Sequence, residues 1–362
     1  MANTLRTPLH TVGGRIVDAS GRPVRLRGVN WYGAEGPDFV PGGLHLRTAD
    51  AIARLTAELG ANCVRLPFSN QLVAANPLPA AEVVAGDPTL AGRPALEVLD
   101  AIIDALTSAG LAVILDNHTS QADWCCDDQD GNGLWHTPEY PEAVWIDQWT
   151  QLAGRYRANQ LVVGADLRNE PRGDARWGGR NAALDWPGAA ERAGAAILTE
   201  APDWLIVVEG VDYASDLRGA AKRPVQLPVA GRLVYSVHDY EWFHGRNLAT
   251  SSMLKRWQSR WEVSRFAPLE VPLLLGEFGM DTSGWPGGLG RTTAHWLRQV
   301  IDLFDEIGAS WIYWPLNGTM SSAAPRWGRS FGAREPFGLL NERWDAPANP
   351  ALIRALFGEA TD

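Results

Sequence analysis

The chain has 362 residues, a formal net charge of −10 and 46% hydrophobic residues, which is the composition of a globular protein with an ample core. Its length fits two average domains or one large barrel. The acidic balance argues against nucleic acid as a partner, because nucleic-acid binding needs a basic surface, whereas a neutral substrate is compatible with it. The 17 tryptophans outnumber the 9 phenylalanines and 7 tyrosines, and flat indole faces suit stacking on sugars.

Targeting signals and cysteine content only loosely restrict the cellular compartment of the protein. No apolar run is long enough to predict a membrane span, so we expect no membrane partner, and we expect a monomer. Residues 1–14 lack the basic start and apolar stretch of a signal peptide, so the chain is expected to be either intracellular or without its leader. The three cysteines are too few for a disulfide framework. Cys63 lies in an apolar run typical of a core strand, whereas the adjacent Cys125 and Cys126 either form a vicinal bridge or remain thiols.

The first half of the chain alternates predicted strands with predicted helices. Residues 14–27 alternate in polarity around an Ala-Ser-Gly turn at 19–21, which predicts a hairpin that closes one end of the fold. Short apolar runs then predict strands, and apolar residues at helical spacing followed by glycine predict helices. In order, these are strand 26–30, helix 48–59, strand 62–67, helix 94–108, strand 111–118 and helix 142–156.

The second half repeats the alternation. Residues 161–170 form an apolar run that ends in Asn169 and Glu170, and Pro171 cannot continue a central strand because it has no amide hydrogen. The remaining elements are helix 187–200, strand 204–209, strand 233–240, helix 251–265, strand 272–277, helix 292–307, strand 310–314 and helix 350–357.

This alternation of eight strands with helices predicts the fold class. It implies right-handed crossovers and a parallel α/β sheet, and eight units in succession favour a closed (β/α)8 TIM barrel over an open doubly wound sheet. No flexible linker divides the chain. We therefore predict one catalytic barrel domain over residues 1–362, with residues 1–13 as an N-terminal extension, a small N-terminal hairpin and long β→α loops.

Polar side chains gather where the predicted strands end. In a barrel these carboxyl ends converge on one face, where the fold places its chemistry. Glu170 and Glu277 end the fourth and seventh strands, and two carboxylates are the minimum equipment for cleaving a glycosidic bond. The strand-end groups are Asn30, Arg65, His118, Asn169, Glu170, Glu209, His238, Tyr240, Glu277 and Trp314.

A subset of these groups carries a family resemblance. Taken in order, Arg65, His118, Asn169-Glu170-Pro171, His238-x-Tyr240, Glu277 and Trp314 resemble glycoside hydrolase family 5, the cellulase family of the clan A barrels. The resemblance implies a retaining β-glycosidase that acts on β-glucosides or β-glucans, with Glu170 as acid/base and Glu277 as nucleophile. The family pattern gives Glu209 no catalytic part, so we interpret Glu209 as a structural or rim residue.

The residue types also fit this chemistry by themselves. Glu170 must be protonated near neutral pH to protonate the leaving oxygen, so burial or a nearby carboxylate must raise its pKa. Glu277 must be ionised to attack the anomeric carbon. Arg65 would favour the ionised form of a nearby carboxylate, and Tyr240 could fix Glu277 with a hydrogen bond.

Other residues are expected to bind or surround the sugar. Asn169 could bind the sugar 2-hydroxyl, a contact that strengthens in the transition state. His118 and His238 would bind sugar hydroxyls or steady a carboxylate, and Trp314 would form the floor under the ring. Further candidates near the strand ends or on the loops of this face are Asn30, Trp31, Trp124, Trp135, Trp177, Trp242 and Trp285.

The loop after the third strand contains a possible cation site. Asp128, Asp130 and Asn132, followed by Gly133 and then Glu139, fit the spacing of an EF-hand calcium loop. The pattern is weakened by Pro138 inside the loop and by a strand, rather than a helix, upstream. A plain acidic surface loop is therefore the preferred interpretation, with structural calcium as the alternative. The glycosidase reaction itself is expected to need neither metal nor organic cofactor.

Several other functions remain open at this stage. An exo-acting β-glucosidase, or a rutinosidase-like diglycosidase that releases a disaccharide from a plant glycoside, would require that the loops at 119–140, 171–186 and 319–347 block one end of the cleft. A non-catalytic carbohydrate-binding barrel would not need both glutamates. A metal-assisted hydrolase is disfavoured because the sequence has no HExxH-type ligand pair. Singly, a strand-end residue such as Arg65 or Asn169 could merely satisfy buried backbone groups.

Overall fold

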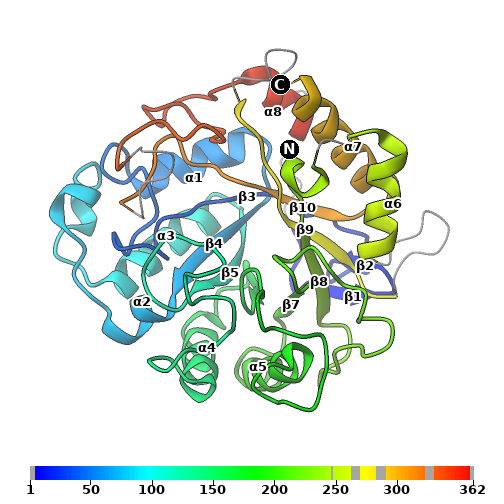
Figure 1. Cartoon of the computed structure of the whole chain (residues 1–362). Coiled ribbons are helices and arrows are strands. Elements are labelled where there is room, and N and C mark those ends of the chain that lie inside the picture. Colours follow the sequence, from blue (N-terminus) through cyan, green and yellow to red (C-terminus); the bar gives the residue numbers. More distant parts are fainter. Residues whose placement is uncertain (1–4, 246–247, 262–269, 283–290, 323–329, 359–362) are drawn as a thin grey trace.

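The computed structural model describes residues 5–245, 248–261, 270–282, 291–322 and 330–358. The strands of its main sheet are β3 (Arg27–Asn30), β4 (Cys63–Ser69), β5 (Ala112–Thr119), β6 (Val162–Asp166), β7 (Leu205–Glu209), β8 (Leu233–His238), β9 (Leu273–Glu277) and β10 (Ser310–Tyr313). All neighbours are parallel, and the sheet closes in the order β10-β3-β4-β5-β6-β7-β8-β9. The (β/α)8 barrel predicted from the sequence is therefore confirmed (Figure 1).

The helices surround the barrel on its outside (Figure 1). They are α1 (Ala49–Glu58), α2 (Asn70–Ala75), α3 (Ala95–Ser108), α4 (Glu142–Tyr156), α5 (Trp186–Glu200), α6 (Thr250–Arg260), α7 (Arg291–Ile307) and α8 (Pro350–Phe357). The predicted helix 251–265 runs past the described residues at its carboxyl end. Short pieces that the sequence did not reveal are α2 and the 3₁₀ helices η1 (Ala81–Val84), η2 (Pro88–Leu90) and η3 (Glu241–His244). Within the described part of the chain, none of the helices has the length and apolar character required to cross a membrane.

The N-terminal hairpin differs from its prediction. It pairs β1 (His10–Val12) with β2 (Arg15–Val17) in antiparallel register, around a turn that contains Gly13 at φ 54°. The predicted turn at 19–21 exists, but only an isolated bridge between Val17 and Pro23 follows it. One pair of hydrogen bonds flanks this bridge, from the Asp18 amide to the Arg22 carbonyl and from the Val24 amide to the Ile16 carbonyl, so the predicted pairing exists only as a short bridge. Residues 10–12, predicted as part of an extension, form the first strand instead.

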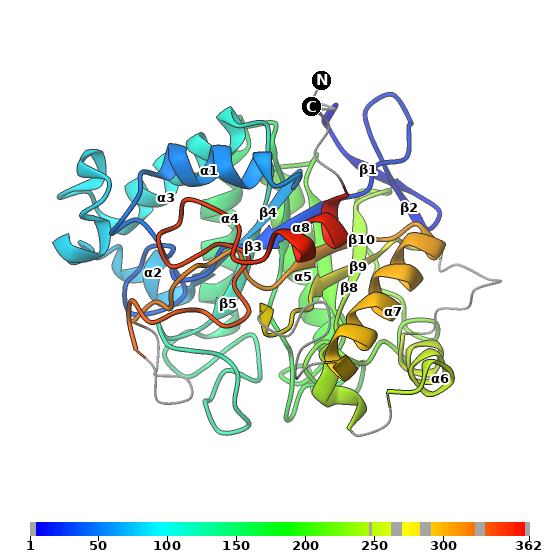
Figure 2. The ribbon, with the colours of Figure 1, turned by 90° about the horizontal axis from the view of Figure 1, so that it is seen from above.

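The hairpin region helps to close one end of the barrel. Leu9 and Ile16 are buried and pack against residues that point into the barrel from its strands. These barrel residues are Leu26, Cys63, Ala112, Ile114, Val163, Leu205, Val207, Val234, Leu274 and Ile312. Figure 2 shows the hairpin at one end of the strands, so the opposite end is left for the site.

The alternation of side chains along each strand positions the polar groups. In β5, Ala112 and Ile114 point into the apolar end of the barrel, whereas Val113 and Leu115 belong to the larger core between barrel and helices. Because side chains alternate between faces, Asp116 and His118 follow Ala112 and Ile114 on the inner face. β4 and β8 show the same progression, from apolar Cys63 and Val234 at the amino end to polar residues at the carboxyl end.

Candidate catalytic site

A cleft of about 590 Å³ lies at the carboxyl ends of the barrel strands. Both glutamates singled out from the sequence line it, together with aromatic side chains from several loops. The lining residues are His118, Trp124, Cys125, Cys126, Asp127, Asp128, Asn169, Glu170, Tyr213, Tyr240, Trp242, Phe243, Glu277, Trp314 and Phe337.

Glu170 does not end a strand, which corrects the sequence prediction. β6 ends at Asp166. Beyond it, the chain forms backbone hydrogen bonds to the strands on both sides: the Leu167 amide donates to the Val207 carbonyl of β7, and the Asn169 amide donates to the Asn117 carbonyl of β5. Glu170 itself has a left-handed φ of 47°, which non-glycine residues rarely adopt. Its amide donates to Glu209 Oε2 at 2.6 Å. This charge-assisted bond holds the backbone turn that places the Glu170 side chain in the cleft.

Glu277 ends β9 as predicted, and two donors hold its carboxylate. Arg65 Nη1 donates to Oε1 at 2.9 Å, and the Tyr240 hydroxyl donates to Oε2 at 2.9 Å. Burial raises the pKa of Glu277, and the neighbouring Glu170 adds to this, whereas His238 and Arg65 act in the opposite direction. The hydrogen bond predicted for Tyr240 is present, and both donors favour the ionised carboxylate.

His238 lies between the two glutamates. Its Nδ1 is 2.9 Å from Glu170 Oε1 and 3.8 Å from Glu277 Oε2, and its Nε2 is 3.2 Å from Glu209 Oε1. Burial alone would lower the pKa of His238, but the carboxylates of Glu209 and Glu277 raise it well above its usual value. One oxygen of Glu170, one of Glu277 and one His238 nitrogen all lie within 4.8 Å of one another. A positively charged imidazole therefore compensates the negative charge at this position.

Arg65 is the centre of a buried charge cluster. Its guanidinium has no exposed surface and forms ion pairs of 2.8 to 3.0 Å with four carboxylates, which belong to Asp116, Asp166, Glu209 and Glu277. Burial would lower the Arg65 pKa, but these carboxylates raise it well above its usual value. Arg65 is therefore a permanent cation that fixes the positions of the acids around it.

Two carboxyl groups of this cluster, those of Asp166 and Glu209, have pKa values shifted in opposite directions. Burial and the neighbouring Glu209 raise the pKa of Asp166 well above its usual value. Burial would also raise the pKa of Glu209, but His238 and Arg65 lower it to about 2. Glu209 is therefore the permanent anion beneath the site. Glu209 is fully buried, which agrees with its interpretation from the sequence as a structural residue and excludes a rim contact.

Asp116 was also missed by the sequence reasoning. Its Oδ2 lies 2.6 Å from His118 Nδ1 and its Oδ1 lies 3.0 Å from Arg65 Nη2, so it joins the histidine to the buried cluster. The signal was its spacing, because a residue two positions before His118 shares the inner face of β5.

The His118 ring stacks on Trp314, with ring centroids 5.4 Å apart. Trp314 also stacks on Tyr32 at 5.3 Å and lines the cleft, although only 5% of it is exposed. The role of Trp314 as a floor under the sugar stays a prediction.

Two of the predicted cleft residues have other roles. Trp31 is fully buried and donates to the Gly42 carbonyl at 2.8 Å, and Trp135 is fully buried and donates to Glu142 at 2.8 Å. The prediction that they line the cleft is wrong, because sequence spacing does not show whether a loop folds its indole inward. Asn30 is also buried, and it supports the site through its Oδ1, which accepts from Arg65 at 3.0 Å.

Of the other loop tryptophans, Trp124 and Trp242 do line the cleft. Trp177 does not, and it donates instead to the Arg223 carbonyl at 2.9 Å. Trp285 lies outside the described residues.

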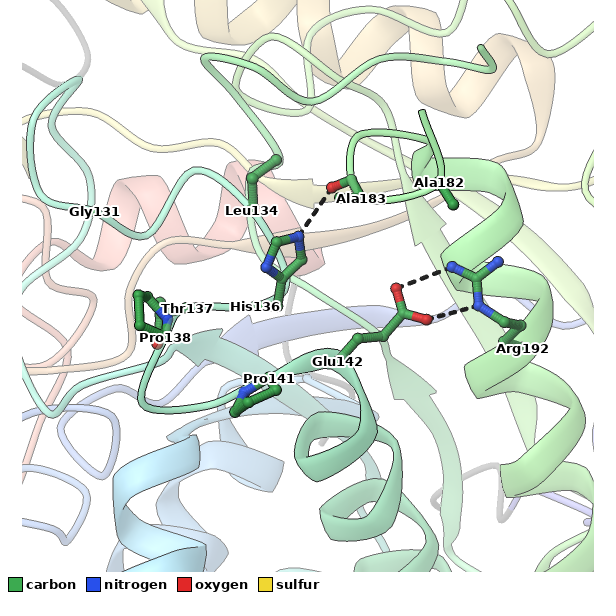
Figure 3. Close-up of a pocket in the computed structure, with 10 residues that line it drawn as sticks. All are labelled: Gly131, Leu134, His136, Thr137, Pro138, Pro141, Glu142, Ala182, Ala183 and Arg192. Carbon is green, nitrogen blue, oxygen red and sulfur yellow. Dashed lines mark hydrogen bonds and ion pairs between the residues drawn. The ribbon is translucent and has the colours of Figure 1, made fainter. Parts of the chain in front are cut away.

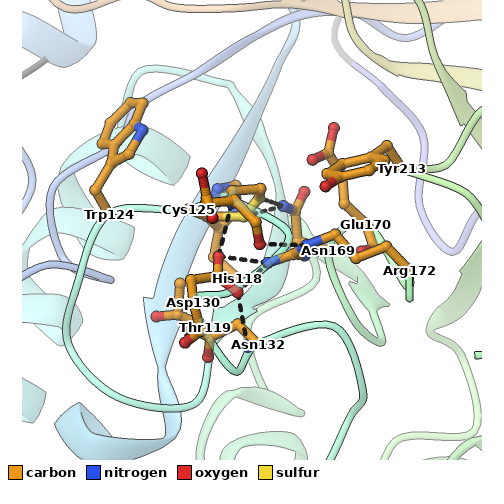
Figure 4. Close-up of a disulfide and its surroundings, with 12 residues drawn as sticks. His118, Thr119, Trp124, Cys125, Asp130, Asn132, Asn169, Glu170, Arg172 and Tyr213 are labelled. Carbon is orange, nitrogen blue, oxygen red and sulfur yellow. Dashed lines mark hydrogen bonds and ion pairs between the residues drawn. A yellow bond between two sulfur atoms is a disulfide. The ribbon is translucent and has the colours of Figure 1, made fainter. Parts of the chain in front are cut away.

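The four predicted calcium ligands have separate partners. Asp130 pairs with Arg172, Asp128 accepts from the Tyr213 hydroxyl, the Asn132 Oδ1 accepts from the Ser120 amide at 2.7 Å, and Glu139 accepts from Gln121 at 3.3 Å. Figure 4 shows Asp130 and Asn132, from the loop after β5, together with Arg172 and Tyr213. The side chains are used to hold the loop, so a cation would have to displace Arg172 from Asp130. Calcium binding stays an untested alternative to the acidic surface loop.

A second hollow, of about 770 Å³, lies beside the first turns of α4 and α5 (Figure 3). Its charged side chains pair with each other: Arg192 donates to both carboxylate oxygens of Glu142, at 2.7 and 2.9 Å. His136 Nε2 lies 2.9 Å from the Ala183 carbonyl. The hollow therefore offers no paired acid and base, and the cleft that holds Glu170 and Glu277 is the candidate site.

Comparison with known proteins agrees with this assignment. Residues 17–319 match the cellulase family, glycosyl hydrolase family 5. An endoglucanase of Paenibacillus polymyxa is 36% identical over 85% of this chain and 79% of its own length. The major extracellular endoglucanase of Xanthomonas campestris pv. campestris is also 36% identical, over 96% of this chain and 70% of its own length.

Solved structures show the same relationship. The catalytic domain of the major endoglucanase from Xanthomonas campestris pv. campestris superposes with a TM-score of 0.81 and 30% identity, over 97% of this chain and all 100% of that chain. A variant endocellulase from Pyrococcus horikoshii in complex with cellotetraose superposes with a TM-score of 0.80 and 27% identity, over 97% of this chain and 99% of that chain.

Proposed function

The chain belongs to the cellulase family, glycosyl hydrolase family 5, and we propose that it cleaves β-glucan chains internally with retention of anomeric configuration. The observation that carries the proposal is the spacing of Glu170 and Glu277, whose nearest carboxylate oxygens lie within 4.8 Å. Retaining glycosidases hold their two carboxyl groups about 5–5.5 Å apart, whereas inverting enzymes need about 6.5–9.5 Å to accommodate a water molecule. The short spacing supports direct attack by a carboxylate.

In the first step, Glu277 is the nucleophile and Glu170 the general acid. The Glu277 carboxylate forms a bond to the anomeric carbon while the glycosidic C–O bond breaks, and Glu170 gives its proton to the departing oxygen. Arg65 and Tyr240 each donate to a different oxygen of Glu277, which fixes the carboxylate for attack. The product of this step is a glycosyl ester on Glu277 and a shortened glucan with a free hydroxyl group.

In the second step, water attacks the same carbon from the face that the leaving group has vacated. Glu170, now ionised, takes a proton from this water, and the ester bond to Glu277 breaks. Two inversions at one carbon give net retention. Each step uses only carboxyl groups and water, so the proposal assigns no metal or organic cofactor to the reaction.

The aromatic lining of the cleft supports a sugar substrate of more than one ring. Trp124, Trp242 and Trp314 come from three separate segments around the glutamates, Trp242 from η3, and 58% of the Trp242 surface is exposed. Exposed indole faces near an acid/base pair can stack on successive sugar rings. The loop at 119–140 lines the cleft through residues 124–128, and the segment at 319–347 contributes Phe337. Endo action is proposed over exo action because the curated relatives given above are endoglucanases.

The test compares the viscosity of carboxymethylcellulose with the reducing ends formed. An endo-acting enzyme should lower viscosity steeply while few reducing ends appear, because each internal cut shortens the chain greatly. An exo-acting glucosidase or diglycosidase would release small sugars with little loss of viscosity, and that result would contradict the proposal.

A further inference from the structure

Two consecutive cysteines form a disulfide in the wall of the cleft. Cys125 and Cys126, in the loop after β5, are bonded to each other, which decides between the bridge and the free thiols left open by the sequence. Both residues line the cleft, and Figure 4 shows Cys125 near Asn169. Cys125 is 6% exposed and Cys126 is half-buried. The mechanism proposed above gives this disulfide no role.

The disulfide contacts the asparagine that precedes the acid/base. Asn169 Nδ2 lies 3.4 Å from the sulfur of Cys125 and 3.4 Å from the sulfur of Cys126. At the other end of the same amide, Oδ1 accepts from Arg65 Nη2 at 2.9 Å. The amide is therefore held from both ends, by a buried cation on one side and by two sulfur atoms on the other.

The same sulfur atoms border the acid/base itself. The two cysteine sulfurs and a carboxylate oxygen of Glu170 all lie within 4.8 Å of one another. A movement of the sulfur atoms would therefore affect both Asn169 and the space beside Glu170.

Disulfide sulfur suits this position chemically. It has no hydrogen to donate and accepts hydrogen bonds only weakly, so it can orient the Asn169 amide while a sugar hydroxyl remains the better acceptor. Two thiols would differ from the disulfide in two ways. Each would carry an S–H group that can donate, and the sulfurs would separate beyond the bonded distance of about 2.05 Å because no covalent bond would join them.

We propose that the Cys125–Cys126 disulfide is a positioning element of the catalytic cleft, which orients Asn169 toward the 2-hydroxyl of the sugar at the cleaved bond. The oxidised protein is then the active form, and reduction to the dithiol lowers catalysis. This inference rests on the proposed glycosidase function, because the 2-hydroxyl contact has meaning only for a sugar bound beside Glu170.

The reduction step balances with a small dithiol as reductant. A thiolate of the dithiol attacks one cysteine sulfur, the S–S bond breaks, and a mixed disulfide forms. The second thiol of the reductant then displaces the enzyme sulfur. In sum, two electrons and two protons pass to the enzyme, which gains two thiols, while the reductant becomes a cyclic disulfide. Cys126 is the accessible entry point because it is half-buried at the cleft surface.

The remaining cysteine provides an internal contrast. Cys63 is fully buried in the apolar end of the barrel, and burial raises the pKa of its thiol to about 12. Thiolates rather than thiols react, so Cys63 stays unreactive in the folded protein. A thiol-specific dye should therefore count two new reactive thiols after reduction.

The experiment measures kcat/KM of the oxidised and the reduced full-length protein on two substrates, an aryl β-cellobioside and its analogue that lacks the 2-hydroxyl at the cleaved sugar. Reduction should lower kcat/KM on the first substrate by about tenfold, the scale of one hydrogen bond. It should change kcat/KM on the 2-deoxy analogue by less than about twofold.

The double variant Cys125→Ser/Cys126→Ser should resemble the reduced protein and should not respond to the dithiol. In the Asn169→Ala background, reduction should have no further effect on either substrate.

The ratio of kcat/KM between the two substrates keeps the test valid even if reduction also unfolds part of the protein. Partial unfolding would lower the active fraction by the same factor for both substrates and would leave the ratio unchanged. The proposal is overturned if the dye counts two new thiols and the ratio stays the same, or if reduction affects the Asn169→Ala variant as strongly as the parent.

Failure of the proposed function would look different. The oxidised protein would then hydrolyse neither substrate, and binding of cellotetraose by titration calorimetry would decide the role of the disulfide. A weaker affinity after reduction would support positioning at a sugar site, and an unchanged affinity would overturn it.

Discussion

The nearest carboxylate oxygens of Glu170 and Glu277 lie within 4.8 Å of each other, although the two residues follow different parts of the barrel sheet. Glu277 stands at the end of β9, whereas Glu170 lies four residues beyond β6 in a left-handed backbone conformation. The positions of both therefore depend on how the strand ends converge and on the bond between the Glu170 amide and Glu209.

Replacement of the proposed general acid should depend on the leaving group. Glu170→Gln should lower kcat on cello-oligosaccharides by about 100-fold or more, because general acid catalysis typically contributes that much. The glycosylation rate on a dinitrophenyl cellobioside should fall far less, because this leaving group needs little protonation. Pre-steady-state kinetics would measure the rate on both substrates. Equal losses in that step would remove Glu170 from the acid role, and Glu58→Gln, on the exposed end of α1, is the matched control.

Loss of the Tyr240 hydroxyl should move the acidic limb of the pH profile. We expect activity to fall at low pH, because the Glu277 carboxylate cannot attack once it is protonated. Burial already raises the pKa of Glu277, so its limb should lie above that of an exposed glutamate. Tyr240 donates to the ionised Glu277, so Tyr240→Phe should raise that pKa further and shift the acidic limb upward by about one pH unit.

The control for this shift is another tyrosine of the same cleft. Tyr213 bonds to Asp128 rather than to Glu277, so Tyr213→Phe should leave the acidic limb in place. An unchanged limb in Tyr240→Phe, or a shift toward lower pH, would mean that the hydroxyl does not stabilise the carboxylate.

A glycine in β9 should prove necessary for the position of His238. A β-carbon at Gly276 would lie 2.6 Å from Ser236 Oγ and 2.9 Å from His238 Nε2. Ser236 can rotate, but Glu170 and Glu209 hold the His238 ring, so the ring must shift. Gly276→Ala should therefore lower kcat by about 100-fold, the cost of misplacing catalytic groups by about 1 Å, and destabilise the fold by about 1–3 kcal/mol.

Activity assays and denaturant unfolding would measure both effects of Gly276→Ala. In Gly154→Ala, within α4, the new β-carbon would meet only a Glu200 oxygen at 3.6 Å, so activity should be retained. Wild-type kcat in Gly276→Ala would show that the His238 position does not matter to the reaction.

Calcium should have no effect on thermal stability. Arg172 already neutralises Asp130, and the other predicted ligands bond to Tyr213, Ser120 and Gln121. We therefore expect the same Tm by calorimetry in excess chelator and in excess calcium. A Tm that falls with chelator and recovers with calcium would establish a bound ion, because a ligand specific for the folded state raises Tm.

Much of the site was predictable because strand periodicity and strand ends are visible in a sequence. Arg65 lies two positions after Cys63, and His118 and His238 lie four positions after the apolar Ile114 and Val234, so all three fall on inner faces and the barrel gathers them at one end. Glu277 followed from the same pattern. These residues depend only on fold class and register.

What the sequence did not reveal depends on contacts between distant residues. Strand periodicity can place Asp116, Asp166 and Glu209 on inner faces, but it does not show that all three carboxylates form ion pairs with Arg65. Likewise, Trp135 fills the core while Trp124, in the same loop, lines the cleft. That difference is set by packing of the loop against α5, which the sequence pattern does not contain.

The most direct test of the central claim is the configuration of the first sugar released. Proton NMR recorded during the early hydrolysis of cello-oligosaccharides, before mutarotation mixes the anomers, distinguishes the two outcomes. If Glu277 attacks and water later attacks the glycosyl ester, the first-formed product is the β-anomer. A 2-fluoro cellobioside with a good leaving group should also trap that ester, and peptide mass spectrometry should place the label on Glu277. First appearance of the α-anomer, or a label on any other residue, would contradict the account.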